Sequence, residues 1–168
     1  APIPAEFRSL HPEIAMMFVP AVTDKFSTVD IEIQTPVEKS FFPTLAMPIV
    51  LVPILRAGLG LLEGFHTALP EASVAHIGMA RNEKTLQPET YYLNVPQELD
   101  KAEVIILDPM LATGGSAIAT VNELKKKNAK KITFVGLLSA PEGSRALSTA
   151  HPDIDIIIAT QHPNHNKP

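Results

Sequence analysis

One stretch near the middle of the chain combines residue types that could bind a phosphorylated sugar. Four apolar, mostly β-branched residues at 104–107 predict a buried strand, and Asp108 stands at its carboxyl end. A short loop then leads through the Thr-Gly-Gly-Ser run at 113–116 into apolar residues at helical spacing. Free N–H groups and the dipole at a helix N-terminus attract an anion, and glycines let the backbone approach it closely. The stretch therefore predicts a phosphate-binding loop.

Asp108 indicates which phosphate ligand this loop would take. A carboxylate repels a phosphate group, so its position is favourable only if it accepts hydrogen bonds from hydroxyl groups of the same ligand. No Lys follows the glycines and the G-x-G-x-x-G spacing is absent, which excludes the P-loop and the dinucleotide-binding turn. We therefore interpret residues 108–116 as a ribose 5-phosphate site. The alternative is an ordinary strand-to-helix turn whose glycines serve only its geometry.

These residues also resemble a known family. Asp108-Pro109, followed by Met-Leu-Ala-Thr-Gly-Gly-Ser, is similar to the phosphoribosyl-diphosphate loop of type I phosphoribosyltransferases. Most of that superfamily has two adjacent acids here, whereas the Asp-Pro pair is the pattern of uracil phosphoribosyltransferases. The resemblance runs from about residue 6 to residue 158. It includes Val-Pro-Ile-Leu-Arg-Ala-Gly-Leu-Gly at 52–60, Arg-Asn-Glu-Lys-Thr-Leu at 81–86 and Ala-Pro-Glu-Gly at 140–143.

The resemblance implies a role for each site residue. Asp108 would bind the ribose hydroxyls, and Arg56 and Arg81 would bind the diphosphate, since a guanidinium fork suits two phosphate oxygens. Mg²⁺ would arrive on the diphosphate and need few protein ligands. A surface cation is the alternative for Arg56, and a surface salt bridge for Arg81. The remaining substrate-binding residues would be Pro109, Met110, Leu111, Ala112, Thr113, Gly114, Gly115 and Ser116.

The implied reaction is displacement at C1 of the ribose. A uracil nitrogen would attack as diphosphate leaves, through a transition state of oxocarbenium character, to give UMP. The family's segment before residue 6 and its C-terminal hood, which holds the uracil, have no counterpart in this sequence. We therefore expect the chain to bind phosphoribosyl diphosphate but to handle uracil poorly. A phosphoribosyl-diphosphate-binding module without base chemistry, regulatory or degenerate, is the alternative to an enzyme.

Composition narrows the class of protein further. A length of 168 residues suits one domain over 1–168, and 45% hydrophobic residues are typical of a globular chain. The net charge of −4 gives no general attraction to nucleic acid or to an anionic membrane. The longest apolar run, at 47–55, is too short to span a bilayer, and no signal-peptide pattern opens the chain. With no cysteine, the sequence fits a reducing cytosol, so we expect a cytoplasmic protein. The resemblance implies a homodimer or higher homo-oligomer.

The surrounding pattern predicts the elements that position the site. Strands alternating with helices imply a doubly wound, mostly parallel sheet with flanking helices, as in type I phosphoribosyltransferases. Because ligands of such sheets bind at the carboxyl ends of the strands, Arg56, Arg81 and Asp108 can converge on one crevice. Strands are predicted at 47–53, 73–79, 104–107, 132–138 and 154–159, and helices from residue 58 to before Pro70, at 115–127 and at 143–150.

Several segments outside this alternation carry weaker patterns. Residues 6–18 have helical periodicity, but Pro12 predicts a kink or late start and Pro20 an early end. Residues 29–34 alternate apolar and polar side chains, which predicts a half-buried strand, and 41–47 is expected to be a connection. The charged residues at about 80–95 are interpreted as a protruding hairpin arm, and 161–168 as a disordered tail.

Overall fold

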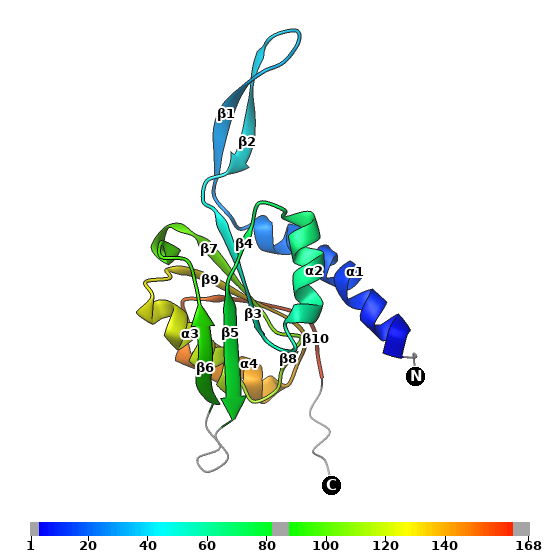
Figure 1. Cartoon of the computed structure of the whole chain (residues 1–168), viewed down its shortest axis with the longest axis vertical. Coiled ribbons are helices and arrows are strands. Elements are labelled where there is room, and N and C mark those ends of the chain that lie inside the picture. Colours follow the sequence, from blue (N-terminus) through cyan, green and yellow to red (C-terminus); the bar gives the residue numbers. More distant parts are fainter. Residues whose placement is uncertain (1–3, 82–87, 163–168) are drawn as a thin grey trace.

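The structure is a computed structural model that describes residues 4–81 and 88–162. It contains a mostly parallel sheet covered by helices on both faces (Figure 1). The elements are, in chain order, α1 (Pro4–Thr23), β1 (Thr28–Gln34), β2 (Lys39–Leu45), β3 (Ile49–Leu55), α2 (Leu59–Ala68), β4 (Ser73–Val74), β5 (His76–Arg81), β6 (Pro88–Asn94), the 3-10 helix η1 (Leu99–Lys101), β7 (Glu103–Leu107), β8 (Met110–Leu111), α3 (Gly115–Lys126), β9 (Lys131–Ser139), α4 (Pro141–Ala150) and β10 (Asp155–Gln161).

The order of the strands defines where a ligand can bind. The main sheet runs β10-β9-β7-β3-β5-β6, with β4 beside β3 and β8 beside β9, and among the described strands of this sheet only the β5–β6 pair is antiparallel. From β3 the chain moves outward to β5, then returns to the other side of β3 for β7, β9 and β10. The order therefore reverses between β3 and β7, the switch point where doubly wound sheets open a crevice at their carboxyl ends. This confirms the predicted fold class.

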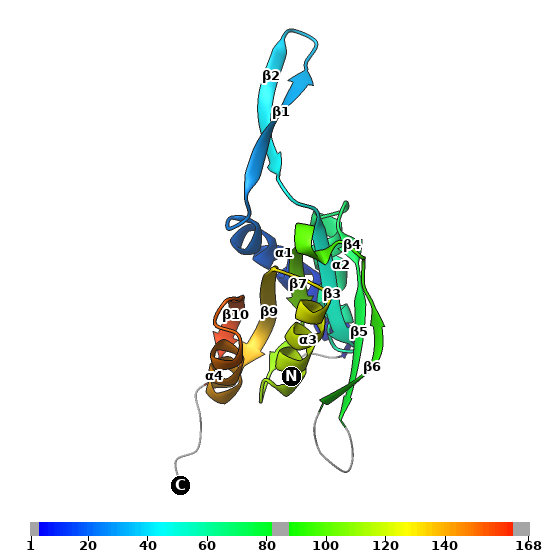
Figure 2. The ribbon, with the colours of Figure 1, turned by 90° about the vertical axis from the view of Figure 1, so that its left-hand side faces the viewer.

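Alternating side chains of the central strands feed two separate apolar cores. Val50, Val104 and Phe134 face α3 and α4, whereas Leu51, Ile105 and Val135 face α1 and α2. The strands β3 and β7 are buried almost throughout, as expected where helices cover both faces of a parallel sheet. Figure 2 shows the strands of this sheet side by side, from β10 at one edge to β6 at the other. The loops that follow β3 and β7 are thus attached to strands that are buried on both faces.

The N-terminal helix is longer than its prolines predict. α1 continues through Pro12 and Pro20 to Thr23, so the expected kink or late start and the early end are wrong. A proline in a helix interior costs about 3 kcal/mol, but each large apolar side chain that the helix buries contributes about 1.5–3 kcal/mol. Phe18 and Val22 are buried in this way against α2. Packing between the two helices therefore outweighs the local preference of the prolines. No helix within the described ranges is long and apolar enough to cross a membrane.

The hairpin that protrudes from the body is β1–β2, and the sequence predicted it only in part. β1 pairs antiparallel with β2 over its whole length, from Thr28 opposite Leu45 to Gln34 opposite Lys39. All seven residues of β1 are exposed, so the predicted half-buried strand is wrong in its burial, and the expected connection at 41–47 is largely a strand. Figure 1 shows this hairpin extending away from the sheet and its helices.

The segment at 80–95 is a hairpin, as predicted, but its described part is an edge of the main sheet. β5 pairs with β3 on one side and with β6 on the other. Met79 and Leu93 pack against the core shared with α3, which ties the hairpin to the body. Residues 82–87, where the arm would turn, lie outside the described residues, and so does most of the predicted tail. Gln161 itself belongs to β10.

Candidate functional site

Two loops leave the sheet at the switch point, and they carry Arg56 and Asp108. β3 and β7 are neighbours, with Pro53 opposite Leu107, so the residues that follow them emerge side by side. Gly58 lets the two loops lie close together, because a Cβ atom at this position would be only 2.3 Å from the carbonyl oxygen of Leu107. The Gly58 N–H also donates a hydrogen bond of 2.8 Å to the Ile54 carbonyl oxygen, which closes the first loop. The predicted convergence of Arg56 and Asp108 is therefore present in the backbone. The Leu55–Arg56 peptide bond is cis.

The loop after Asp108 is fixed by the neighbouring strand and helix. Met110–Leu111 forms the short strand β8 beside the end of β9, and the Ala140 N–H donates a 2.9 Å hydrogen bond to the Leu111 carbonyl oxygen. Gly143 of α4 lies against the same loop, since a Cβ atom there would be 2.4 Å from the carbonyl oxygen of Ala112. The Ala-Pro-Glu-Gly motif thus supports the phosphate loop from behind. Sequence reasoning identified this motif but not its contact, because the contact joins segments about thirty residues apart.

The turn into α3 leaves the N-terminus of that helix free to bind an anion. Gly114 has a φ of 84°, in the left-handed region that favours glycine, and it forms the N-cap of α3 without a side-chain hydrogen bond. The first N–H groups of α3 therefore lack a capping side chain within the described part of the chain. They border a cavity of about 90 Å³, the volume of roughly three water molecules. It is lined by Asp108, Met110, Leu111, Ala112, Thr113, Gly114, Gly115, Ser116 and Ala117.

Asp108 is half-buried at the edge of this cavity and has an unusual acidity. Burial raises the pKa of its carboxyl group from 3.8 to about 6, and a hydrogen bond of 3.4 Å from the Met110 N–H lowers it in part. Among the described residues no cation pairs with this carboxylate. A desolvated carboxylate with one weak donor has free acceptor capacity. It is therefore suited to a ligand that brings hydroxyl groups, as the sequence predicts.

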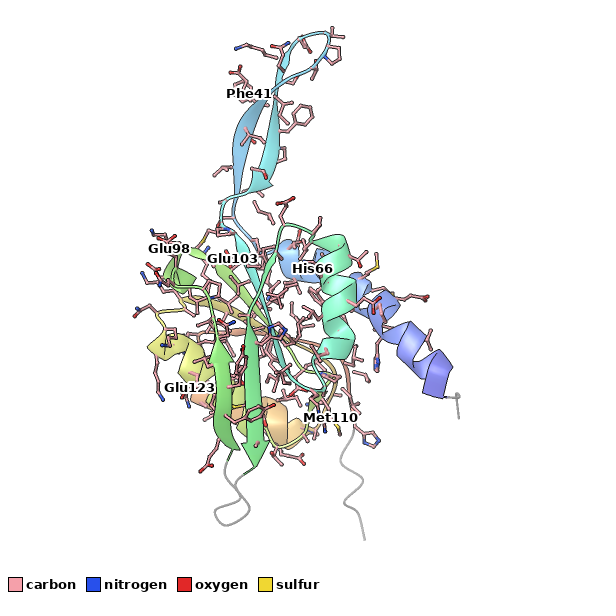
Figure 3. The ribbon with its side chains drawn as sticks, viewed as in Figure 1. Phe41, His66, Glu98, Glu103, Met110 and Glu123 are labelled. Atoms are coloured by element: carbon pink, nitrogen blue, oxygen red, sulfur yellow. The ribbon has the colours of Figure 1, made fainter. Side chains whose placement is uncertain are left out.

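The structure describes the other predicted site residues to different extents. Arg56 is exposed at the crevice and forms no ion pair with any described residue. Arg81 is the last residue of β5, and its backbone is paired with Pro88, but its side chain lies outside what the structure describes. Pro109 connects the loop to β9, because its carbonyl oxygen accepts hydrogen bonds of 3.1 and 3.0 Å from the N–H groups of Leu137 and Leu138. Met110 is 56% exposed at the end of the body opposite Phe41 (Figure 3).

The donor set at the crevice fits a cation that arrives with its ligand. Within residues 4–81 and 88–162, no three His, Asp or Glu side chains converge in a way that could cage a metal ion. The crevice offers the oxygens of one carboxylate, Asp108, and Mg²⁺ is commonly held by one or two carboxylates together with substrate phosphates and water. The residues present are thus compatible with Mg²⁺ bound to a diphosphate.

Comparison with solved structures identifies the class of fold. A hypoxanthine phosphoribosyltransferase from Staphylococcus aureus matches with a TM-score of 0.63 and 15% identity, over 94% of this chain and 75% of that one. The AQ2163 protein of Aquifex aeolicus matches with a TM-score of 0.85 and 35% identity, over 92% and 74%. The fold, with its loop at the switch point, is that of a type I phosphoribosyltransferase.

Comparison of sequences narrows this class to one family. The family model described as uracil phosphoribosyltransferase matches residues 3–167. A protein named uracil phosphoribosyltransferase from Streptococcus equi subsp. zooepidemicus is 50% identical over 155 residues, which cover 92% of this chain and 74% of that protein. One of the same name from Acholeplasma laidlawii is 44% identical over 153 residues, with 91% and 74% covered. The chain belongs to the uracil phosphoribosyltransferase family, as its motifs indicated.

Proposed function

We propose that this chain transfers the 5-phosphoribosyl group of phosphoribosyl diphosphate to uracil, giving UMP and diphosphate. The observation that carries the proposal is the crevice at the switch point. There the Asp108 carboxylate and the Arg56 guanidinium, which have no ion-pair partner in the described part of the chain, lie after neighbouring strands, and the N-terminus of α3 has no side-chain cap there. These groups match the ribose hydroxyls, the 5-phosphate and the diphosphate of one molecule. Family membership supports uracil as the acceptor base.

Each group has a defined task in this reaction. The N–H groups at 112–116 cradle the 5-phosphate, and the Asp108 carboxylate accepts hydrogen bonds from the ribose hydroxyls. Arg56 and Arg81 bind the diphosphate, on which negative charge develops as the bond to ribose C1 breaks. Met110 and the rest of 108–116 line the same cavity and form its wall. The sugar is thereby held at both ends while the base nitrogen forms the new bond to C1.

The protein contributes positioning and charge stabilisation to this displacement. The uracil nitrogen supplies the electron pair for the new bond, the diphosphate leaves with the pair of the old one, and the N–H proton of uracil is released. Fixing the two reactants in line replaces an encounter in solution, which is a large source of rate enhancement. Mg²⁺ carried on the diphosphate would neutralise part of its charge, with oxygen ligands from the substrate.

The direct test is formation of UMP by the purified protein. With phosphoribosyl diphosphate and Mg²⁺, we expect UMP from uracil. Slow turnover, or equal turnover of other pyrimidines, would instead agree with the expectation from the sequence that this chain handles uracil poorly. Arg56→Ala is expected to raise the KM for phosphoribosyl diphosphate at least about tenfold, since a charge-assisted bond contributes about 1.5–3 kcal/mol. Lys130→Ala, which removes an exposed cation immediately before β9, is the matched control and should change nothing. Binding of phosphoribosyl diphosphate without any UMP would favour the regulatory alternative and overturn the enzyme.

The protruding hairpin supports the homodimer as a second proposal. Phe41 and Phe42 are 67% and 46% exposed on β2, and Val37 at the turn is 92% exposed. A two-stranded hairpin is marginally stable in water, and exposed apolar side chains mark an interaction surface. Phe42, opposite Ile31, and Phe41, opposite Glu32, lie on the two faces of this ribbon. We propose that a second copy covers it. A cytoplasmic location and a single domain over 1–168 are proposed from composition and length alone.

A further inference from the structure

Tyr91 occupies an irregular position within the strand β6. In the β5–β6 pair, Gly78 lies opposite Tyr92 and Met79 opposite Thr90, so Tyr91 is an extra residue without an opposite partner. Such a bulge redirects the side chain of the extra residue and bends its strand. The ring of Tyr91 is turned over Gly78: a Cβ atom at Gly78 would lie 2.4 to 2.9 Å from three ring atoms at the hydroxyl end. Tyr91 is 61% exposed, so the outer face of the ring is open while the inner face covers backbone.

The backbone under this ring is the junction between β5 and the loop of Arg56. β3 pairs first with β4, and then with β5 through two further positions, Ile54 opposite Ile77 and Leu55 opposite Gly78. The second is the last pair of the ladder, and Arg56 follows it directly. The hydrogen bonds of a ladder's last pair face competition from water unless a side chain covers them. Gly78 is buried, because the Tyr91 ring covers the space that a side chain at this position would occupy.

The opposite face of the hairpin is secured by different contacts. The Thr90 hydroxyl donates to Met79 Sδ at 3.3 Å, and Met79 and Leu93 pack against the core under α3. The hairpin is therefore fixed to the body on this face by the core, whereas on the other face the ring of Tyr91 covers Gly78, the residue that pairs with Leu55 at the end of β3. Loss of the ring would expose only this second face.

We propose that Tyr91 is a positioning residue for the binding of phosphoribosyl diphosphate. Its ring shields the Leu55–Gly78 pair from water, which keeps β5 paired with the end of β3, and the loop that carries Arg56 thereby stays at the diphosphate position. Gly78 belongs to the same device, because any side chain there would displace the ring. This proposal rests on the role of Arg56 in the proposed function.

The test is a double-mutant cycle between Tyr91 and Gly78, read as Michaelis constants. Tyr91→Ala is expected to raise the KM for phosphoribosyl diphosphate about tenfold while kcat falls about twofold or less and the KM for uracil is unchanged. Gly78→Ala should raise the same KM, and the double variant should be no worse than Tyr91→Ala alone. Tyr91→Phe keeps the ring and should behave as the unmodified protein. Tyr92→Ala, at the adjacent position, is the matched control. Should Tyr91→Ala fail to fold, Tyr91→Leu replaces it, with a smaller rise expected.

The outcomes separate this proposal from the proposed function. Arg56→Ala is measured in parallel. If Arg56→Ala raises the KM for phosphoribosyl diphosphate while Tyr91→Ala and Tyr91→Leu leave it unchanged, the positioning role is wrong and the function stands. Additive effects of Tyr91→Ala and Gly78→Ala, or a Tyr91→Phe variant as impaired as Tyr91→Ala, also overturn the role of the ring. If Arg56→Ala has no effect, the assignment on which the proposal rests is itself wrong.

Discussion

The two ends of the sheet use charge in opposite ways. At the amino end, where β7, β9 and β10 begin, acids and lysines are matched: Lys131 binds Glu103 at 2.8 Å, and Lys25 binds Asp155 at 2.6 Å. At the carboxyl end, Asp108 and Arg56 have no ion-pair partner among the described residues. Figure 3 shows Glu103 and Met110 at these opposite ends.

This difference separates groups that stabilise the fold from groups that await a ligand. Paired surface charges contribute a little to stability and leave nothing for a ligand to bind. An unpaired, half-buried carboxylate such as Asp108 destabilises the fold, so its presence is explained by what it binds. Substitutions at the two ends should therefore have opposite consequences for activity and stability.

The largest effect is expected from Asp108→Asn. Affinity for phosphoribosyl diphosphate should fall about 100-fold, because hydrogen bonds to a charged acceptor are lost. Folding raises the pKa of Asp108 from 3.8 to about 6, so the folded state binds this proton more tightly than the unfolded chain does. The free energy of unfolding therefore falls as the pH rises through this window. At pH 7 the ionised carboxylate lowers the free energy of unfolding by up to about 3 kcal/mol, and the neutral side chain of Asn should remove this loss.

Calorimetric titration measures the affinity of Asp108→Asn, and denaturant unfolding at pH 4 and pH 7 measures its stability. The variant should be at least as stable as the unmodified protein at pH 7. A variant that binds normally, or one that unfolds more easily at pH 7, would contradict this interpretation of the carboxyl end.

Gly58→Ala should damage both activity and stability. A Cβ atom at this position would lie 2.3 Å from the Leu107 carbonyl oxygen, and backbone cannot move aside as a side chain can. Overpacking of this kind costs about 1–3 kcal/mol, and the displaced loop should reduce turnover about tenfold. Gly60→Ala is the control, because its Cβ would meet only the His11 side chain at 3.3 Å. Equal effects of the two variants on turnover would show that the loop junction is not special.

Substitutions on the β1–β2 hairpin should weaken self-association and leave the reaction that each chain catalyses unaltered. Replacing Phe41 and Phe42 with Ser removes exposed apolar rings that contact no core of their own chain. Self-association should weaken at least about tenfold if these rings are buried by a second copy. Sedimentation equilibrium gives the dissociation constant, and Val29→Ser on β1 serves for comparison. An unchanged association constant would remove the hairpin from the interface.

The smallest effect is expected at the amino end of the sheet. Lys131→Met leaves the Glu103 side chain, only 9% exposed, without its partner and should cost about 1 kcal/mol with unchanged turnover. Lys101→Met breaks a pair whose side chains are 66% and 74% exposed, and should cost nothing measurable. Thermal unfolding compares the two variants. A loss of activity in Lys131→Met would mean that the two ends are coupled.

The alternating strands and helices were predictable because buried parallel strands have near-continuous apolar sequences. β3, β7 and β9 all follow this rule, and the Asp108 loop follows from the strand that precedes it. The contacts of Gly58 and Gly143 were not predictable, since each depends on the backbone of a distant segment.

The hairpins and α1 show why other segments were interpreted incorrectly. Alternating residues such as Val29 and Ile31 have the same pattern whether the covering layer belongs to this chain or to another. Local rules for Pro12 and Pro20 cannot include the packing of α1 on α2 that outweighs them. In both cases the outcome depended on what the segment packs against, which a local sequence pattern does not contain.

The most direct test of the central claim is the pH dependence of phosphoribosyl-diphosphate affinity in the unmodified protein and in Asp108→Asn. The charged carboxylate is proposed to bind the ribose hydroxyls, and its pKa of about 6 means that it becomes neutral as the pH falls through this value. Titration of the ligand's own phosphates affects both proteins equally and cancels in the ratio of their affinities. The ratio should be large at pH 7.5 and fall by up to about tenfold per pH unit below pH 6. A ratio that stays constant from pH 7.5 to pH 5 would contradict the claim that ionised Asp108 binds the sugar.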